Sequence, residues 1–144
     1  MFFSGVRPAV NVGLSVSRFG GAAQKKAMKK VSGTLRMDLA QFREMVVFAQ
    51  FSSELDKATQ TLLAQGERLT EMLKQPQFSP FPFEDQVVLL YVVKKDAILK
   101  IPVKKMNEFK KEFLEFVKVH YREVLRRIMK SGELTDDDKT LLDE

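Results

Sequence analysis

The chain has 144 residues, with 24 Lys and Arg against 19 Asp and Glu, and a formal net charge of +5. It contains no cysteine, which excludes disulfide scaffolds, thiolate metal sites and thiol catalysis. Its single histidine, His120, would have to carry any histidine-dependent chemistry alone. Hydrophobic residues make up 44% of the chain, so a folded domain is expected and a disordered chain is excluded.

The positive charge is concentrated at the start of the chain. Residues 1–37 contain seven basic residues and no acidic one, whereas the remaining 107 hold 17 basic and 19 acidic residues and sum to −2. The segment from Glu133 to Glu144 contains six carboxylates and a single basic residue, Lys139. This asymmetry suggests an anionic partner for the basic segment, the alternative being a solvated helix face. The seven basic residues are Arg7, Arg18, Lys25, Lys26, Lys29, Lys30 and Arg36.

The first half of the sequence changes character near residue 22. Residues 4–21 alternate small, apolar and turn residues without helical period, which predicts an extended segment followed by a loop. Residues 22–51 carry apolar side chains at steps of three and four, typical of one long amphipathic helix with Gly33 as a weak point. Ser52 and Ser53 offer an N-cap for a second helix, which Gly66 divides into two in one interpretation.

Prolines and capping residues divide the second half. Pro76, Pro80 and Pro82 interrupt the helical pattern, and Glu84 opens a short buried helix that includes the apolar run 87–93. Residues 106–128 predict a last long helix, ended by Gly132, and Thr135 with Asp138 forms a capping box for a short final segment. The predicted fold class is all-α: a bundle of about five or six helices preceded by a short extended or loop segment.

No sequence motif for a self-sufficient active site is present. The sequence has no Gly-x-x-x-x-Gly-Lys-Ser/Thr loop, no Gly-x-Gly-x-x-Gly and no His-Glu-x-x-His, and no metal site is predicted. One residue stands out, because Arg18 lies at a strand-to-loop exit just before a helix. Its planar fork of donors would suit phosphate oxygens across an interface.

The stretch from Gly5 to Gln24 closely resembles the alpha subunit of F-type ATP synthases, at the junction between its nucleotide-binding and C-terminal helical domains. Residues 1–90 match in detail and the rest mainly in pattern, so the resemblance extends over essentially all 144 residues. It implies a C-terminal fragment, in which residues 1–21 are the remnant of the nucleotide-binding domain and residues 22–144 are the helical domain. The matching segments after Gln24 are 27–31, 38–44, 48–51, 55–60, 66–69, 73–80, the helix from Glu84, and 112–114.

The resemblance also implies roles for particular residues. Arg18 matches the arginine finger that the alpha subunit supplies in trans to the catalytic site of a beta subunit. Arg7, Pro8, Gln75 and Gln77 match part of the adenine pocket of the alpha subunit's own non-catalytic site, and residues 53–56 match the turn facing the central stalk. Two departures are Phe19, where valine is usual, and residues 92–100, which replace a glycine-containing turn.

The implied setting is a large complex. The resemblance predicts beta and gamma subunits and other alpha subunits of an alternating hexamer as partners, on the cytoplasmic, matrix or stromal face of an energy-transducing membrane. The intact subunit would bind ATP or ADP with Mg; the fragment is expected to bind none, to be inactive without a phosphate-binding loop, and to self-associate. The alternative is a basic helical module that binds nucleic acid through residues 7–36 with strong salt dependence. Its aromatic residues lie on apolar stripes, which argues against stacking on bases.

Overall fold

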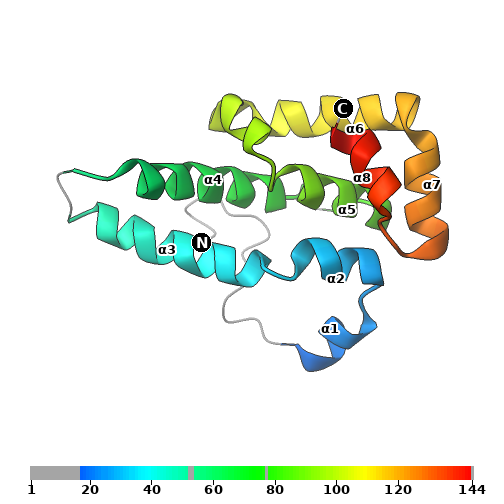
Figure 1. Ribbon diagram of the computed structural model, residues 1–144, viewed down its shortest axis with the longest axis horizontal. Coiled ribbons are helices and arrows are strands. Elements are labelled where there is room, and N and C mark those ends of the chain that lie inside the picture. Colours follow the sequence, from blue (N-terminus) through cyan, green and yellow to red (C-terminus); the bar gives the residue numbers. More distant parts are fainter. Residues whose placement is uncertain (1–16, 52–53, 77, 144) are drawn as a thin grey trace.

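The computed structural model describes residues 17–51, 54–76 and 78–143. Within these ranges the protein forms eight α-helices and two short 3-10 helices and no strand, which confirms the predicted all-α class. The α-helices are more numerous than the five or six expected, because two of the long helices predicted from the sequence are each divided and because a helix also forms at residues 18–23, where a loop was expected. Figure 1 shows an elongated molecule, with a two-helix arm at one end and a cluster of helices at the other.

The described part begins with a helix. Helix α1 (Arg18–Ala23) starts after Ser17, whose hydroxyl accepts a hydrogen bond from the Gly20 amide at 2.9 Å. The predicted loop is therefore wrong for residues 18–21, where the serine cap starts a helical turn in spite of two glycines. The extended part of that prediction, residues 4–16, lies outside the described residues.

The helix predicted over residues 22–51 is divided in two. Helix α2 (Lys26–Ser32) and helix α3 (Leu35–Ala49) are separated at Gly33 and Thr34, where glycine weakens the helix and the β-branched threonine supports it poorly. The break has a tertiary reason, because α2 packs against α5 whereas α3 packs against α4. One straight helix would not reach both partners.

Helices α3 and α4 (Lys57–Leu73) run antiparallel and form the arm in Figure 1. Asp56 begins α4, because its carboxylate accepts the Thr59 amide at 3.2 Å; the predicted caps Ser52 and Ser53 lie outside the described residues. The predicted division at Gly66 is wrong, since α4 is continuous. Gly66 is buried against the ring of Phe42, so its missing side chain serves close packing of the two helices.

Helix α5 (Phe83–Val92) crosses the centre of the helix cluster and contacts α2, α6 and α7. Four consecutive apolar residues, 87–90, are buried, so the second half of α5 is enclosed by the core, whereas its first turn carries Glu84 and Asp85. The 3-10 helices η1 (Asp96–Lys100) and η2 (Val103–Lys105) follow α5 and lead into the next α-helix. Arg68 of α4 holds η1 by donating to the carbonyl oxygens of Ile98, Leu99 and Ile101 at 2.9–3.1 Å.

The last long helix is also divided. Helix α6 (Met106–His120) and helix α7 (Arg122–Ser131) meet at Tyr121, whose backbone (φ −123°, ψ 32°) leaves the helical region and produces a sharp turn (Figure 1). Gly132 ends α7 in the left-handed conformation at φ 68°, as predicted. The capping box is confirmed: the Thr135 hydroxyl accepts the Asp138 amide at 3.2 Å, and Asp138 accepts the Thr135 amide, at the start of helix α8 (Asp136–Asp143).

A single hydrophobic core joins these helices. Its largest fully buried apolar side chains belong to α5, η1, α6 and α7, so the core lies in the helix cluster, with the arm extending from it. They are Val87, Val88, Ile98, Met106, Val117, Val124 and Ile128.

Candidate functional site

The described residues include only part of the predicted site. Arg18 is the first residue of α1, and its side chain is outside the described part. Gln75 is half-buried just beyond the end of α4, whereas Arg7, Pro8 and Gln77 lie outside the described residues. The surroundings of Gln75 are therefore the part of the predicted adenine pocket that the structure describes in detail.

A buried lysine holds the end of α4 next to Gln75. Lys110 of α6 is 3% exposed, and its ammonium donates to the carbonyl oxygens of Glu71 at 3.1 Å and Lys74 at 2.7 Å. These carbonyls belong to the last turn of α4, where backbone acceptors lack helical partners. Burial lowers the pKa of Lys110, with Glu71 opposing that shift and Lys74 adding to it.

The loop from Gln75 to Pro82 is fixed at its far end too. The Phe81 ring lies 5.7 Å from the Lys110 ammonium, and the Phe81 carbonyl oxygen accepts a hydrogen bond from the Gln86 amide group at 2.7 Å. Between the two ends, Phe78 has a left-handed backbone at φ 60° and a side chain that is 95% exposed. The loop therefore presents an aromatic side chain to solvent from a backbone position that costs free energy to maintain.

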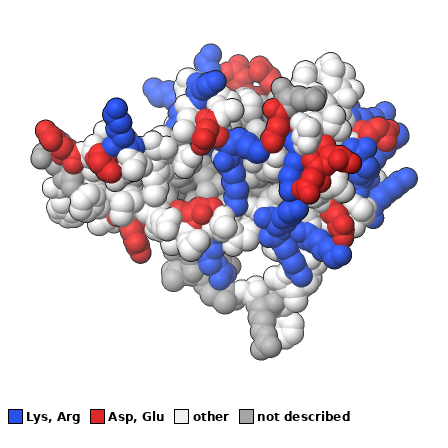
Figure 2. All heavy atoms as spheres, viewed as in Figure 1, with Lys and Arg blue, Asp and Glu red and all other residues white. Residues whose placement is uncertain are grey.

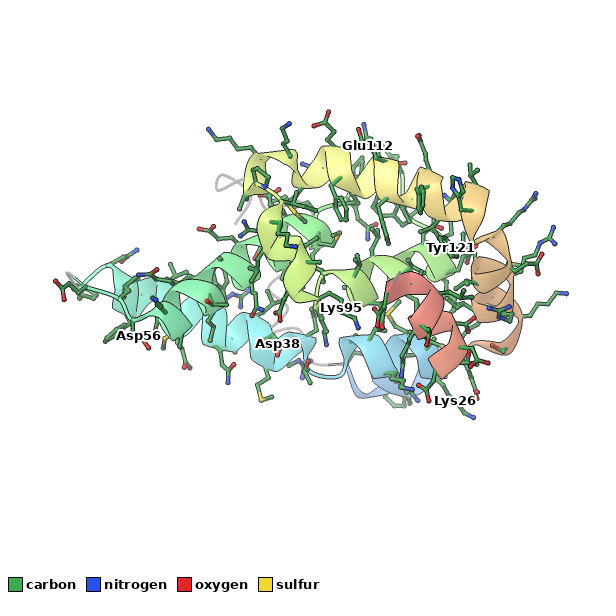
Figure 3. All side chains as sticks on the ribbon, turned by 45° about the horizontal axis from the view of Figure 1, so that its top comes forward. Lys26, Asp38, Asp56, Lys95, Glu112 and Tyr121 are labelled. Atoms are coloured by element: carbon green, nitrogen blue, oxygen red, sulfur yellow. The ribbon has the colours of Figure 1, made fainter. Side chains whose placement is uncertain are left out.

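A second apolar surface lies at the tip of the arm. Val47, Phe48 and Phe51 are each more than half exposed near the link between α3 and α4. Figure 3 marks the same tip by Asp56, at the start of α4. Residues 53–56, which the resemblance assigns to the turn facing the central stalk, belong to this link. Several large apolar side chains at one exposed tip are typical of a contact surface.

The basic start of the sequence meets its acidic end. Lys26 of α2 pairs with Glu133 at 2.7 Å, and Lys30 lies 3.9 Å from Asp136 at the start of α8. The backbones are joined as well, since the Ala27 amide donates to the Gly132 carbonyl oxygen at 2.7 Å. Figure 2 shows basic and acidic side chains interleaved over the end of the molecule opposite the arm, and Figure 3 places Lys26 beside α8. The anionic partner of these two lysines is the protein itself, which does not support the nucleic-acid alternative.

The pKa shifts agree with these contacts. The Lys26 ammonium lowers the pKa of Glu133, and Glu133 raises that of Lys26. Lys95, which bonds to the last residue of α8 at 2.8 Å, lowers the pKa of Asp143. Asp138 is fully buried, which opposes its ionisation, but hydrogen bonds from Thr135 and Arg127 outweigh that cost and lower its pKa. These ion pairs therefore hold α8 against the rest of the molecule.

The described residues offer no catalytic grouping of their own. His120 is exposed, with its ring stacked on Phe116 at 4.3 Å and Nδ1 3.1 Å from the Phe116 carbonyl oxygen. No cluster of three or more His, Cys, Asp or Glu residues suited to a metal ion occurs in the described ranges. No helix among those described has the length and apolar content required to cross a membrane.

The fold and these surfaces define a class: an all-α helical domain with exposed apolar side chains at the tip of its arm and at Phe78. Comparison with known proteins makes the class specific. Residues 24–144 match the sequence model for the C-terminal domain of the alpha and beta subunits of ATP synthase. The protein belongs to this family.

Individual relatives among curated proteins support the same family assignment. The sequence is 54% identical over 142 residues to the ATP synthase subunit alpha of Acetivibrio thermocellus, covering 99% of this protein and 28% of the relative. It is 53% identical over 137 residues to that of Clostridium acetobutylicum, covering 95% and 27%, and 49% identical over 144 residues to that of Clostridium botulinum, covering 100% and 29%. These 144 residues therefore span less than a third of the length of these relatives.

Sequence reasoning missed Lys110 and the aromatic tip. Lys110 follows Met106 by four residues and precedes Leu114 by four, so it occupies the buried face of α6. A lysine at a position of the apolar stripe is the signal in the sequence that could have revealed this buried cation. The sequence analysis did not single out Phe48 or Phe51, and both side chains are more than half exposed near the link between α3 and α4.

Proposed function

We propose that this protein is the C-terminal part of the alpha subunit of a proton-translocating F-type ATP synthase. In that subunit it forms the helical collar below the nucleotide-binding domains and faces the central stalk. The observation that carries the proposal is the identity of about half of all residues with subunit alpha sequences over 95–100% of its length. The exposed aromatic tip beside residues 53–56 is the surface expected of a domain that contacts a central shaft.

The proposed partners are beta subunits, a gamma subunit and further alpha subunits in an alternating hexamer. Arg18 acts there as an arginine finger in the catalytic site of a neighbouring beta subunit, where its guanidinium stabilises the negative charge of the transferring phosphoryl group. Arg7, Pro8, Gln75 and Gln77 contribute one wall of the adenine pocket that holds ATP or ADP with Mg in the intact subunit. The complex lies on the face of the membrane where nucleotide is bound, and this domain meets the membrane only through other subunits.

A chimera tests the proposal. These 144 residues replace the matching C-terminal part of the Acetivibrio thermocellus alpha subunit, and the complex is assembled with that organism's other subunits. The chimera is expected to assemble and to hydrolyse ATP. Failure to assemble, when the unaltered alpha subunit assembles under the same conditions, would contradict the assignment of the whole protein.

The role of Arg18 is tested within the same complex. Arg18→Ala is expected to lower steady-state ATP hydrolysis by about 10³-fold or more, with assembly unchanged by size-exclusion chromatography. Arg122→Ala is the matched control, because Arg122 is an exposed arginine on α7, and it should leave turnover near that of the chimera. Near-normal turnover of the Arg18 variant would remove that residue from the catalytic site while leaving the subunit assignment intact.

A further inference from the structure

Lys110 is the most deeply buried cation in the described part of the protein, and it contacts both ends of one loop. It lies on the inner face of α6, between Met106 and Leu114 in the i, i+4 series, and 3% of it is exposed. Burying an ammonium group is costly unless strong acceptors surround it. The Glu71 and Lys74 carbonyl oxygens, at the negative end of the α4 dipole, supply that compensation.

The other end of the loop is held through an aromatic ring. Phe81 lies 5.7 Å from the Lys110 ammonium, within the range of a cation–π contact, and its backbone carbonyl oxygen is bound by Gln86 of α5. The span from Lys74 to Phe81 is therefore anchored to α6 at its start and to α6 and α5 at its end. Pro76 and Pro80 restrict the backbone between these anchors.

The exposed middle of the loop has the properties of a presented surface. Phe78 keeps a left-handed backbone that a side chain of its size adopts at a cost, and 95% of it is exposed to solvent. Such a conformation persists only where the flanking structure holds it. Lys110 contacts the segments on both sides of Phe78, through the Lys74 carbonyl oxygen and the Phe81 ring.

We propose that Lys110 is the positioning residue of the loop between Lys74 and Phe81, and that by fixing both ends of this loop it sets the placement of Gln75 toward a bound adenine ring. The part that concerns adenine rests on the proposed function, whereas the anchoring of the loop does not. Lys110 touches no nucleotide in this proposal. Its effect is on base recognition, because a loop that moves by a fraction of a hydrogen-bond length loses the geometry that distinguishes one base from another.

The first experiment uses the 144-residue protein. Because it has no cysteine, Ser79→Cys introduces a unique thiol for a nitroxide spin label. Lys110→Met keeps the length of the side chain and removes its donors, so the spectrum is expected to shift from an immobile to a mobile component. Lys111→Met, at the exposed neighbouring position, should leave the spectrum unchanged. An unchanged spectrum in the Lys110 variant would contradict the anchoring.

The second experiment measures base selectivity in the chimeric complex. Binding of ATP and GTP to the non-catalytic sites is compared, and Lys110→Met is expected to reduce the preference for ATP by about three- to tenfold, the size of one hydrogen bond. Lys111→Met should leave the ratio unchanged. If Lys110→Met does not fold, Lys110→Gln replaces it in both experiments, and the expected changes have the same direction. Glutamine is shorter and uncharged but keeps a hydrogen-bond donor.

Loop mobility tests the anchoring by Lys110, and base selectivity tests the role of the loop toward adenine. A mobile loop with unchanged selectivity would overturn the adenine role of the loop while leaving its anchor and the subunit assignment intact. A mobile loop with reduced selectivity and an unchanged rate of ATP hydrolysis at saturating nucleotide supports the whole proposal. Reduced selectivity with an immobile loop would overturn it, because the effect would then not pass through the loop.

Discussion

Gly66 of α4 lies directly against the aromatic ring of Phe42 of α3, with no space for a side chain at residue 66. A Cβ atom built there would overlap the ring and the Cβ atom of Phe42. The two helices of the arm therefore approach each other closely at this point, and the absence of a side chain is what permits the approach.

Gly66→Ala should destabilise the domain although it improves the helix propensity of α4. The alanine methyl group overlaps a partly buried ring held between two helices, and overpacking of this kind costs about 1–3 kcal/mol, more than the gain of about 1 kcal/mol from removing a helical glycine. We expect a net loss of up to about 2 kcal/mol in the free energy of unfolding, measured with urea. Gly21→Ala is the matched control, because no atom lies within 4 Å of its Cβ position. It should be neutral or slightly stabilising, and equal behaviour of the two variants would refute the packing argument.

Asp138→Ala should weaken the attachment of α8. The carboxylate is fully buried, accepts two hydrogen bonds from Arg127 at 2.7 and 2.5 Å, and completes the capping box with Thr135. Loss of the cap and of charged hydrogen bonds, discounted for the half-exposed Arg127, should cost about 2–3 kcal/mol. Asp137→Ala, exposed in the same turn, should cost less than about 0.5 kcal/mol. Thermal unfolding of the three proteins checks this order, and similar midpoints for both variants would contradict it.

Acid should loosen the contact between α8 and the rest of the molecule. The pKa values of Glu133, Asp136, Asp138 and Asp143 are all lowered in the fold, from ordinary values of 4.5 for Glu and 3.8 for Asp. Above these ordinary values the carboxylates are ionised in both the folded and the unfolded protein, so their stabilisation is complete. As pH falls below them, the unfolded protein binds protons first, and the stabilisation is lost until the lowered folded pKa values are passed.

Unfolding curves between about pH 6 and about pH 2 should therefore be flat at first and then show falling stability below about pH 4.5. A variant with Lys26→Met and Lys95→Met, which lacks the partners of Glu133 and Asp143, should fall less steeply over the same range. A pH dependence identical to that of the unchanged protein would show that these ion pairs do not carry the effect.

Much of the fold follows from local sequence patterns. The short buried helix after Pro82, the end of α7 at Gly132 and the Thr135–Asp138 capping box were all predicted, because each depends on residues within one or two turns of each other. The divisions between helices were not. The backbone bends at Gly33 and at Tyr121 and stays straight at Gly66, and in each case packing against the neighbouring helices determines whether the helix continues. Glycine illustrates this, because it weakens an isolated helix but allows close packing in an assembled one.

The residues of the candidate site also differ in whether they could be identified from the sequence. Arg18 and Gln75 were identified from the resemblance of short segments, and their roles remain proposals. Lys110 was not identified, because a lysine in an amphipathic pattern is by default a surface residue. Its two acceptors come from residues 36 and 39 positions earlier in the sequence, so only the packed structure brings them together.

Three properties could be read from the amino-acid sequence alone: the all-α class with a basic start and an acidic end, the resemblance to an ATP synthase alpha subunit, and the lack of a motif for an independent active site. These properties depend on composition, on periodicity and on motifs that are contiguous in the sequence. Three further properties required the folded structure: the contact between the two charged segments, the close packing at Gly66, and the buried Lys110 that contacts the loop after α4. Each of these depends on which residues, distant in sequence, are brought within a few ångströms when the apolar faces of the helices are buried together.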